Sequence, residues 1–320
     1  MGYPIYILGA GFSKAFSEKM PTLNDLSISL LDDKYKEDLP NLYEFIYKRK
    51  EYLIHLNANI IEAVSNILFS NNLCFTVKDN SEFEVIKFEF LQFIHLTLID
   101  FQIDKDKEEL LKKFIFEVVD RHGKIITFNY DLIISDFIRD NLTRTSDINI
   151  LLNDHISEMD NFINELLYGF HEKNHPRKKN GRVDILKLHG SFDWYKLPGI
   201  DDFDLKSITK ITDGEKQGDF LLYNVPVYIP MAHSKEYYFK GSLFPSLWQK
   251  AYYWLKECDE IIFIGYGFPE TDVVNFNFFL QFKDKIKDIV VMNDHNLKKL
   301  TNIFGEKVKS FGALKYIETL

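Results

Sequence analysis

The sequence predicts an α/β protein in which a mostly parallel sheet is covered by helices on both faces. Short apolar runs rich in β-branched residues alternate with helical patterns along the chain, which is typical of such a sheet. The first apolar run passes directly into a glycine turn, in the stretch "IYILGAGFSK" of Ile5–Lys14. A chain of 320 residues is long enough for one such domain with insertions.

Six segments are expected to form strands, and a seventh has a weaker pattern. The six are Tyr3–Leu8, Lys124–Phe128, Asp184–Leu188, Val225–Pro230, Glu260–Ile264 and Asp288–Met292, and the seventh is Ala313–Ile317. A helix is expected over Lys107–Arg121, closed by Gly123 in the left-handed conformation. We interpret residues 1–320 as a single domain with a helical insertion at about 26–119 and a second insertion at about 139–182.

Composition and charge argue against several classes of protein. The net charge of −9 argues against a general nucleic-acid binder, and the 46% apolar content argues against disorder. The two cysteines, Cys74 and Cys258, are isolated, so neither a disulfide framework nor a cysteine zinc site is supported. No apolar run reaches the roughly 18 residues that span a bilayer, and no signal peptide precedes the first expected strand. We therefore expect a cytoplasmic protein without a membrane partner.

The first motif that carries chemistry is the glycine turn of residues 9–13. Gly9 and Gly11 let backbone N–H groups approach a pyrophosphate, and Ser13 offers a hydroxyl donor at the start of the next helix. The third glycine of the common dinucleotide fingerprint, expected at Lys14, is absent. The alternative interpretation is an ordinary tight turn.

Two further motifs follow expected strands, where ligands of open α/β sheets bind. In "TFNYD", Asn129 and Asp131 are polar groups two residues apart, although Asn129 is also a good helix N-cap. In "LKLHGSFDW", His189 closes an apolar run and is suited to act as a base near neutral pH. A structural histidine is the alternative.

The fourth motif, "IIFIGYGFPETD", runs from a buried strand into Gly265, Tyr266 and Gly267. These glycines permit a second close approach of the backbone to a ligand. The next strand is followed by Asn293, whose side chain suits a ribose hydroxyl. A nucleotide cradle is therefore expected between the two glycine turns.

In this order, the motifs resemble those of the sirtuin family and, more narrowly, the sirtuin-like NAD-hydrolase domains of bacterial anti-phage defence proteins. The resemblance implies a Rossmann-like sheet and an NAD site. In that site, Ala10, Gly11 and Ser13 would hold the pyrophosphate, and Gly265 and Asn293 would lie along the adenosine half. Asp131 would face the nicotinamide amide. Asn129 would orient the attacking group, and His189 would be the base. Gly9, Phe12, Tyr266 and Gly267 belong to the same cradle.

One departure from the family guides the choice of reaction. Deacylating sirtuins carry a four-cysteine zinc module after the His-Gly motif, and Phe192–Val225 contains no cysteine. Water is thereby favoured over an acyl-lysine as the attacking group. We therefore predict an NAD+ glycohydrolase that releases nicotinamide and ADP-ribose.

Two other functions remain open from the sequence. One is a protein deacylase or ADP-ribosyltransferase of sirtuin type, and the other is a non-catalytic module that senses NAD or ADP-ribose.

The resemblance also implies partners and a biological role. It implies an effector that depletes NAD during abortive infection, held in check by homo-oligomerisation or by an encoded partner subunit. The chain would contact nucleic acid only through such a partner, if at all. No metal is expected, because His171 and His175 are the only closely spaced histidines and lie in an apparent loop.

Overall fold

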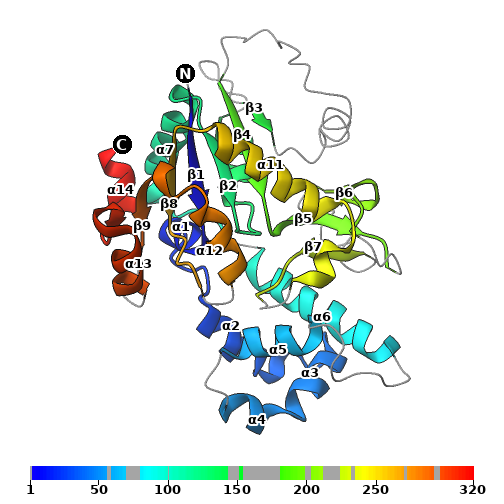
Figure 1. Cartoon of the computed structure of the whole chain (residues 1–320). Helices are drawn as coiled ribbons and strands as arrows, with labels where there is room; N and C mark the ends of the chain where they lie inside the picture. Colours follow the sequence, from blue (N-terminus) through cyan, green and yellow to red (C-terminus); the bar gives the residue numbers. More distant parts are fainter. Residues whose placement is uncertain are drawn as a thin grey trace. The chain divides into compact units, whose positions relative to one another are not determined.

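The computed structural model (Figure 1) describes residues 2–55, 59–69, 80–99, 101–142, 151–153, 181–198, 203–211, 224–231, 235–269, 272–291 and 296–320. The chain divides into two compact units. The first comprises Met1–Glu18, Gln102–His189 and Leu243–Leu320, and the second comprises Lys19–Phe101 and Gly190–Ser242.

The first unit contains a seven-stranded sheet in the order β10-β9-β8-β1-β2-β4-β3, in which every neighbouring pair is parallel. Its strands are β1 (Pro4–Leu8), β2 (Lys124–Thr127), β3 (Leu151–Asn153), β4 (Arg182–Lys187), β8 (Glu260–Ile264), β9 (Ile286–Val290) and β10 (Val308–Lys309). The predicted α/β class with a mostly parallel sheet is confirmed.

The two central strands are apolar along almost their whole length. Every residue of β1 is buried, and so are the last four of β8. Strands buried on both faces need continuous apolar sequence rather than alternation, which is why "PIYIL" and "EIIFI" are recognisable from sequence.

The register of the parallel pairs aligns the strand ends that carry the motifs. Leu8 pairs with Thr127 on one side and with Ile264 on the other, and Thr127 pairs with Lys187. The chain therefore leaves β1, β2, β4 and β8 at the same edge of the sheet.

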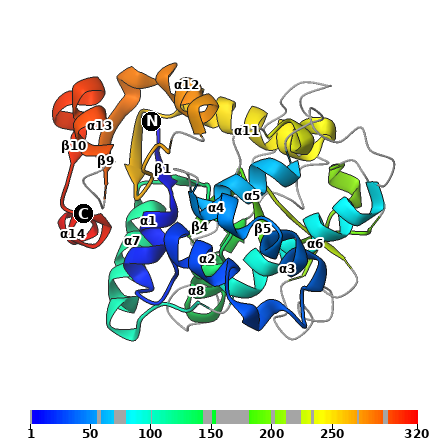
Figure 2. The same ribbon diagram turned by 90° about the horizontal axis from the view of Figure 1, so that it is seen from below.

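Helices cover both faces of this sheet, as expected. On one side, α14 contacts both α1 and α7, while α11 and α12 lie on the other side (Figure 2). The α-helices formed by the described residues of this unit are α1 (Ala10–Phe16), α7 (Glu108–Asp120), α8 (Ile133–Asn141), α11 (Leu243–Glu257), α12 (Val273–Leu280), α13 (Leu297–Phe304) and α14 (Ala313–Thr319).

The described residues of the second unit form five α-helices and a small antiparallel sheet in the order β6-β5-β7. Its elements are α2 (Leu23–Leu30), α3 (Pro40–Tyr47), α4 (Lys50–His55), α5 (Ile60–Phe69), α6 (Asn80–Leu98), β5 (Gly190–Lys196), β6 (Thr209–Lys210) and β7 (Val225–Tyr228). Helix α2 begins with a capping box between Thr22 and Asp25, and Pro40 starts α3.

The structure corrects two of the strand predictions. Strand β7, predicted within Val225–Pro230, belongs to the antiparallel sheet, where it pairs with β5. The segment Ala313–Ile317 is helical, because Ala313, Tyr316 and Ile317 are buried at helical spacing after Gly312. The last strand of the parallel sheet is β10, before that glycine.

The helix predicted over Lys107–Arg121 is confirmed as α7, but Gly123 does not close it in the left-handed conformation. That conformation is taken by His122, with φ of 52°. A Cβ at Gly123 would lie 3.0 Å from the Tyr6 ring, so a larger residue would require its neighbours to shift slightly.

The predicted insertions are distributed between the units. Helices α2–α6 of the segment 26–119 lie in the second unit, and α7 lies in the first. The insertion predicted at 139–182 falls largely on residues 143–150 and 154–180, which lie outside the described residues. Among the described helices, none is long and apolar enough to cross a membrane.

The core of the second unit encloses a histidine. His95 of α6 is only 1% exposed and packs edge-on against Phe192, with ring centroids 5.0 Å apart. Its Nδ1 has no hydrogen-bond partner among the described residues. Desolvation by burial lowers the pKa of His95 from 6.5 to about 4.

We expect His95 to make the protein less stable in acid. Between pH 6.5 and about 4 the unfolded chain takes up a proton that the folded imidazole does not, so the free energy of unfolding falls by up to about 3 kcal/mol. Urea unfolding of His95→Gln should show a weaker loss towards acid than the wild type. The exposed His55→Gln serves as control, and equal slopes in all three proteins would refute the prediction.

Candidate active site at the carboxyl ends of the parallel strands

The turns after β1 and β8 pack against each other through their backbones. The Gly11 N–H donates to the Gly265 carbonyl at 2.9 Å, and the Gly9 N–H donates to the Ile264 carbonyl at 3.2 Å. A Cβ on Gly265 would lie 2.1 Å from the Phe12 nitrogen, and Gly265 has φ of +68°. The Gly265 N–H donates to the Val290 carbonyl at 2.9 Å. Gly9, Gly11 and Gly265 are therefore required by packing, and all three of their N–H groups are already used.

Gly267 differs from these three glycines. A Cβ at this position would meet no atom within 4 Å, and its φ is not in the left-handed region. Its carbonyl accepts a 2.7 Å hydrogen bond from the Asn296 side chain. Since packing does not require glycine here, the open space allows a ligand to approach the backbone.

Only some residues of the turn 9–13 are exposed to a ligand. Ala10 is exposed at the start of α1, whereas Phe12 is buried with its ring against Phe16 and Phe114. The predicted contact of Phe12 with a cofactor is thus limited to its backbone.

Asn129, half-buried after β2, is held by its amide nitrogen. Nδ2 donates to the Gly9 carbonyl at 2.9 Å and to Ser13 Oγ at 2.8 Å. A carbonyl can only accept, so the first contact fixes which end of the amide is nitrogen. The Oδ1 of Asn129 has no partner among the described residues and is left to accept a hydrogen bond from a hydroxyl or water.

Ser13 is buried beside Asn129. It is 2% exposed, and its Oγ accepts from Asn129 Nδ2. Desolvation raises the pKa of Asp131, and the charge of Lys187 and the Ser13 hydroxyl oppose that rise. The Ser13 hydroxyl takes part in this internal contact, and its contact with a pyrophosphate stays a prediction.

Lys187 is a residue that the sequence analysis missed. It is buried at the end of β4, and its Nζ donates to the Asp131 carbonyl at 2.6 Å and to the Tyr130 carbonyl at 3.4 Å. A lysine inside the apolar run "ILKLHG" is the signal that marks it, because buried lysines are rare unless they are paired.

His189 lies in the turn after β4 and is buried. Its ring meets Phe128 edge-on, with centroids 4.8 Å apart. Its Nε2 lies 3.4 Å from Nδ2 of Asn275, a residue of α12 that the sequence analysis also missed. Phe128 in turn stacks on Tyr266 at 4.6 Å, so His189 and the turn after β8 lie on one aromatic cluster.

Tyr266 lies within the predicted cradle, between Gly265 and Gly267. It is buried, and its hydroxyl donates to Asp272 at 2.9 Å. Asn293, the last of the predicted site residues, lies outside the described residues.

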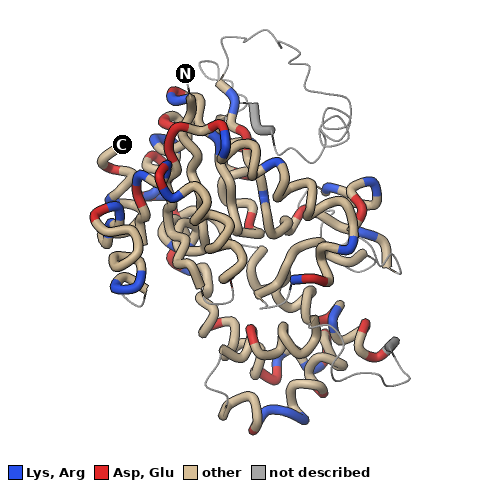
Figure 3. Tube along the Cα trace, in the orientation of Figure 1, with Lys and Arg blue, Asp and Glu red and all other residues tan. Residues whose placement is uncertain are grey.

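The structure therefore brings Gly9, Ser13 and Asn129 into one hydrogen-bonded group, and it places His189 beside Phe128, the neighbour of Asn129. Asp131 follows two residues later, and its carbonyl accepts from Lys187. Within the described part of the chain, no group of three or more His, Cys, Asp or Glu could hold a metal ion. Described charges of both signs are interspersed along the trace (Figure 3).

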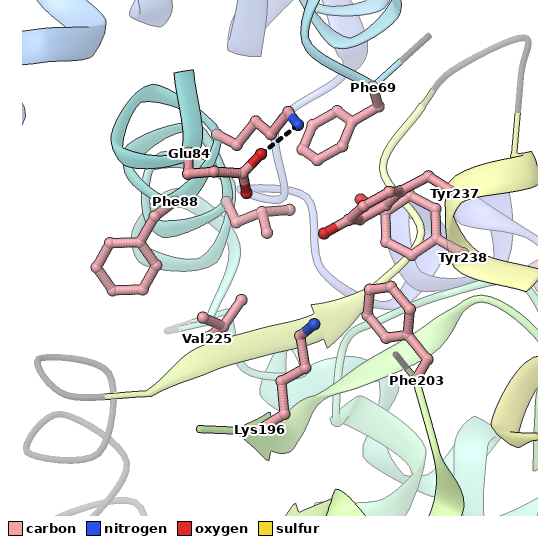
Figure 4. Close-up of a pocket in the computed structure, with 10 residues that line it drawn as sticks. Phe69, Glu84, Phe88, Lys196, Phe203, Val225, Tyr237 and Tyr238 are labelled. Atoms are coloured by element: carbon pink, nitrogen blue, oxygen red, sulfur yellow. Dashed lines mark hydrogen bonds and ion pairs between the residues drawn. The ribbon is translucent and has the colours of Figure 1, made fainter. Parts of the chain in front are cut away.

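A separate small cavity of about 70 Å³ lies within the second unit (Figure 4). The ammonium of Lys196 lies 4.1 Å from the centre of the Phe203 ring, and Lys87 pairs with Glu84 at its rim. No predicted site residue lines this cavity. Its other aromatic walls are Phe69, Phe88, Tyr237 and Tyr238.

Comparison with known proteins gives low similarity. No family model matches the chain, and no curated protein matches it either. A solved structure from work on the mechanism and regulation of Sir2 enzymes is 12% identical, with a TM-score of 0.47, over 98% of this chain and 88% of that one. Sir2 bound to an acetylated peptide is 10% identical, with a TM-score of 0.44, over 99% of this chain and 91% of that one.

Sir2Tm bound to a propionylated peptide is 12% identical, with a TM-score of 0.42, over 99% of this chain and 91% of that one. Identity and TM-score are low in all three cases. The function proposed for this chain therefore depends on its own residues.

Two glycines of the turn after β8 should respond differently to the same substitution. We expect Gly265→Ala to lower the melting temperature strongly, because its methyl group would overlap the Phe12 backbone. Gly267→Ala should leave the melting temperature within about 1–2 °C of wild type and weaken binding of ADP-ribose. Thermal unfolding and calorimetry test both. Unchanged affinity in Gly267→Ala would show that no ligand uses this space.

Proposed function

We propose that this chain is an NAD+ glycohydrolase that cleaves NAD+ to nicotinamide and ADP-ribose. The observation that carries the proposal is Asn129, whose amide nitrogen is fixed by Gly9 and Ser13 and whose Oδ1 remains an acceptor at the carboxyl edge of the sheet. An acceptor held in this way suits the positioning of a water molecule.

The proposed cleavage of NAD+ does not require an acidic side chain to protonate the leaving group. When the bond between ribose C1′ and the nicotinamide nitrogen breaks, its electron pair neutralises the pyridinium, so the leaving group needs no proton. Water then bonds to C1′ of the oxocarbenium-like ribose and loses one proton. Glycosidases acting on uncharged leaving groups need a carboxyl pair for this step, and an NAD+ site does not.

His189 is the proposed acceptor of that proton. Its Nε2 faces the amide nitrogen of Asn275 at 3.4 Å, which is longer than a normal hydrogen bond. A nitrogen in such a contact can accept a shorter hydrogen bond from a hydroxyl or water and then take up the proton.

The remaining groups would bind the substrate. Asp131 would face the nicotinamide amide, and its raised pKa suits a carboxyl group that shares a hydrogen bond with an amide. The backbone around Ala10 and Gly267 would lie along the pyrophosphate and the adenosine half, together with the predicted Asn293. Gly11 and Gly265 would support this surface through their mutual packing.

Water, rather than an acyl-lysine, is the proposed attacking group. The segment Phe192–Val225 contains no cysteine, so it lacks the zinc module that frames the peptide cleft of deacylating sirtuins. Incubation of the purified chain with NAD+, with and without an acetylated peptide, separates the reactions. Nicotinamide release without peptide supports hydrolysis, release only with peptide indicates deacylation, and binding without release indicates a sensor.

The motif resemblance extends the proposal to biology. We propose that the enzyme acts in the cytoplasm as the NAD-depleting effector of an anti-phage defence system, restrained by self-association or by an encoded partner. Expression of the wild type and of a His189→Ala variant in phage-challenged bacteria, with NAD measured over time, tests this role.

Replacing either central residue should remove the activity. We expect Asn129→Ala and His189→Ala each to lower the turnover of NAD+ by about a hundredfold or more, because one positions the water and the other takes its proton. Asn141→Ala and the exposed His55→Ala are controls of the same type and should keep wild-type turnover. Wild-type rates in both site variants would refute the assignment.

Metal removal should have no effect on turnover. The charge that drives cleavage is carried by the departing pyridinium, so no step requires a bound cation. Dialysis against EDTA followed by a rate measurement tests this expectation. Loss of activity that added Zn²⁺ or Mg²⁺ restores would contradict the proposed chemistry.

A further inference from the structure

The small cavity of the second unit is lined by none of the residues assigned to NAD+, and the proposed reaction does not use it. Among the described residues that line it, five are aromatic, two are aliphatic and three are charged. They come mainly from α5, α6, β5, β7 and the short helix Glu236–Lys240 (Figure 4). Apolar walls with a few charged groups are typical of small-molecule sites.

The aromatic walls are held in place by packing against one another. The ring of Phe203 lies 5.0 Å from that of Tyr238 and 5.5 Å from that of Tyr237, measured between centroids. Phe69 lies 5.8 Å from Tyr238 and 6.1 Å from Tyr237. Aromatic pairs at these separations attract one another, so the space that they enclose is formed before a ligand enters.

Lys196 gives the cavity a buried positive charge. It is 4% exposed, and its Nζ lies 4.1 Å from the centre of the Phe203 ring. Figure 4 shows its side chain pointing from β5 towards the aromatic rings. Lys87 also lines the cavity, but Glu84 lies 2.6 Å from its Nζ and offsets its charge. Two lysines and one glutamate leave the lining positive, which favours an anionic ligand.

A cationic ligand is disfavoured, although aromatic cages commonly bind cations. The ring faces already hold cations of the protein itself, because Lys196 lies over Phe203 and the Nζ of Lys87 lies 5.4 Å from the centre of the Tyr237 ring. A further positive charge between these rings would be repelled by both ammonium groups.

The size of the cavity restricts the anion. A cavity of roughly 150 Å³ holds a benzene molecule, and one water takes about 30 Å³ of the liquid. The volume of about 70 Å³ therefore suits an ion of only a few heavy atoms. Apolar walls suit a methyl group better than further anionic oxygens, which would lose their hydration there.

We propose that this cavity binds a small aliphatic carboxylate such as acetate. Its carboxylate would contact the Lys196 ammonium, and its methyl group would lie between the rings of Phe69, Phe203 and Tyr238. The site is additional to the one proposed for NAD+, and the inference does not rest on the proposed function.

Carbon-13-labelled acetate added to the purified full chain tests the site by NMR, because the methyl signal of a small ion broadens when it exchanges with a protein. We expect broadening that unlabelled acetate and propionate reverse and that the same concentration of sodium chloride does not. Tetramethylammonium and benzoate should not compete, since the first has the wrong charge and the second has a ring too large for the space.

Two site variants and one control assign the signal to this cavity. Lys196→Met removes the charge and keeps an unbranched side chain, and it should weaken acetate binding by about tenfold or more. Val225→Phe keeps Lys196 and fills the space, so it should also weaken binding and tests the site if Lys196→Met does not fold. Lys240→Met is the matched control, because Lys240 is exposed and does not line the cavity.

Loss of binding in the two site variants, with wild-type binding in Lys240→Met, would support the site. Wild-type affinity in either folded site variant would overturn it, and so would a wild type that does not broaden the acetate signal. Competition by tetramethylammonium or benzoate would show that the charge or the size assigned to the ligand is wrong.

Discussion

The hydrogen bond from the Gly11 N–H to the Gly265 carbonyl holds the turn after β1 against the turn after β8, and the other parts of the site depend on that contact. It forms only because neither position has a side chain, since a Cβ on Gly265 would lie 2.1 Å from the Phe12 nitrogen. Parallel pairing of β1 with both β2 and β8 places these turns at one edge. The site is thus built on the most buried strands of the first unit.

Two groups of contacts extend from these turns. The Gly9 carbonyl accepts a hydrogen bond from the Asn129 amide, which also donates to Ser13. Tyr266, next to Gly265, stacks on Phe128, whose ring meets His189 edge-on. Each of the two residues to which the reaction is assigned is therefore in contact with one of the turns or with its aromatic neighbours. This is also why substitution of Gly265 should affect stability first.

The sequence predicts the parallel sheet well because strands buried on both faces leave continuous apolar runs. It fails at Ala313–Ile317, where a short apolar run fits a strand and an amphipathic helix equally, and only packing decides. The sequence also assigns Val225–Tyr228 to the wrong sheet, because the residues of a strand do not specify which other strands it pairs with. Asn129 and His189 were found through motifs. Asn275 contacts His189 from a distant part of the sequence, which no local pattern reports, whereas the apolar run around Lys187 marks that lysine.

A crystal structure with ADP-ribose bound tests the central claim most directly, because its C1′ hydroxyl occupies the place of the attacking water. The account predicts that this hydroxyl donates to Asn129 Oδ1, with His189 beside it and the Gly267 backbone along the other half of the ligand. ADP-ribose bound away from the turns after β1 and β8, or a C1′ hydroxyl remote from Asn129, would contradict it.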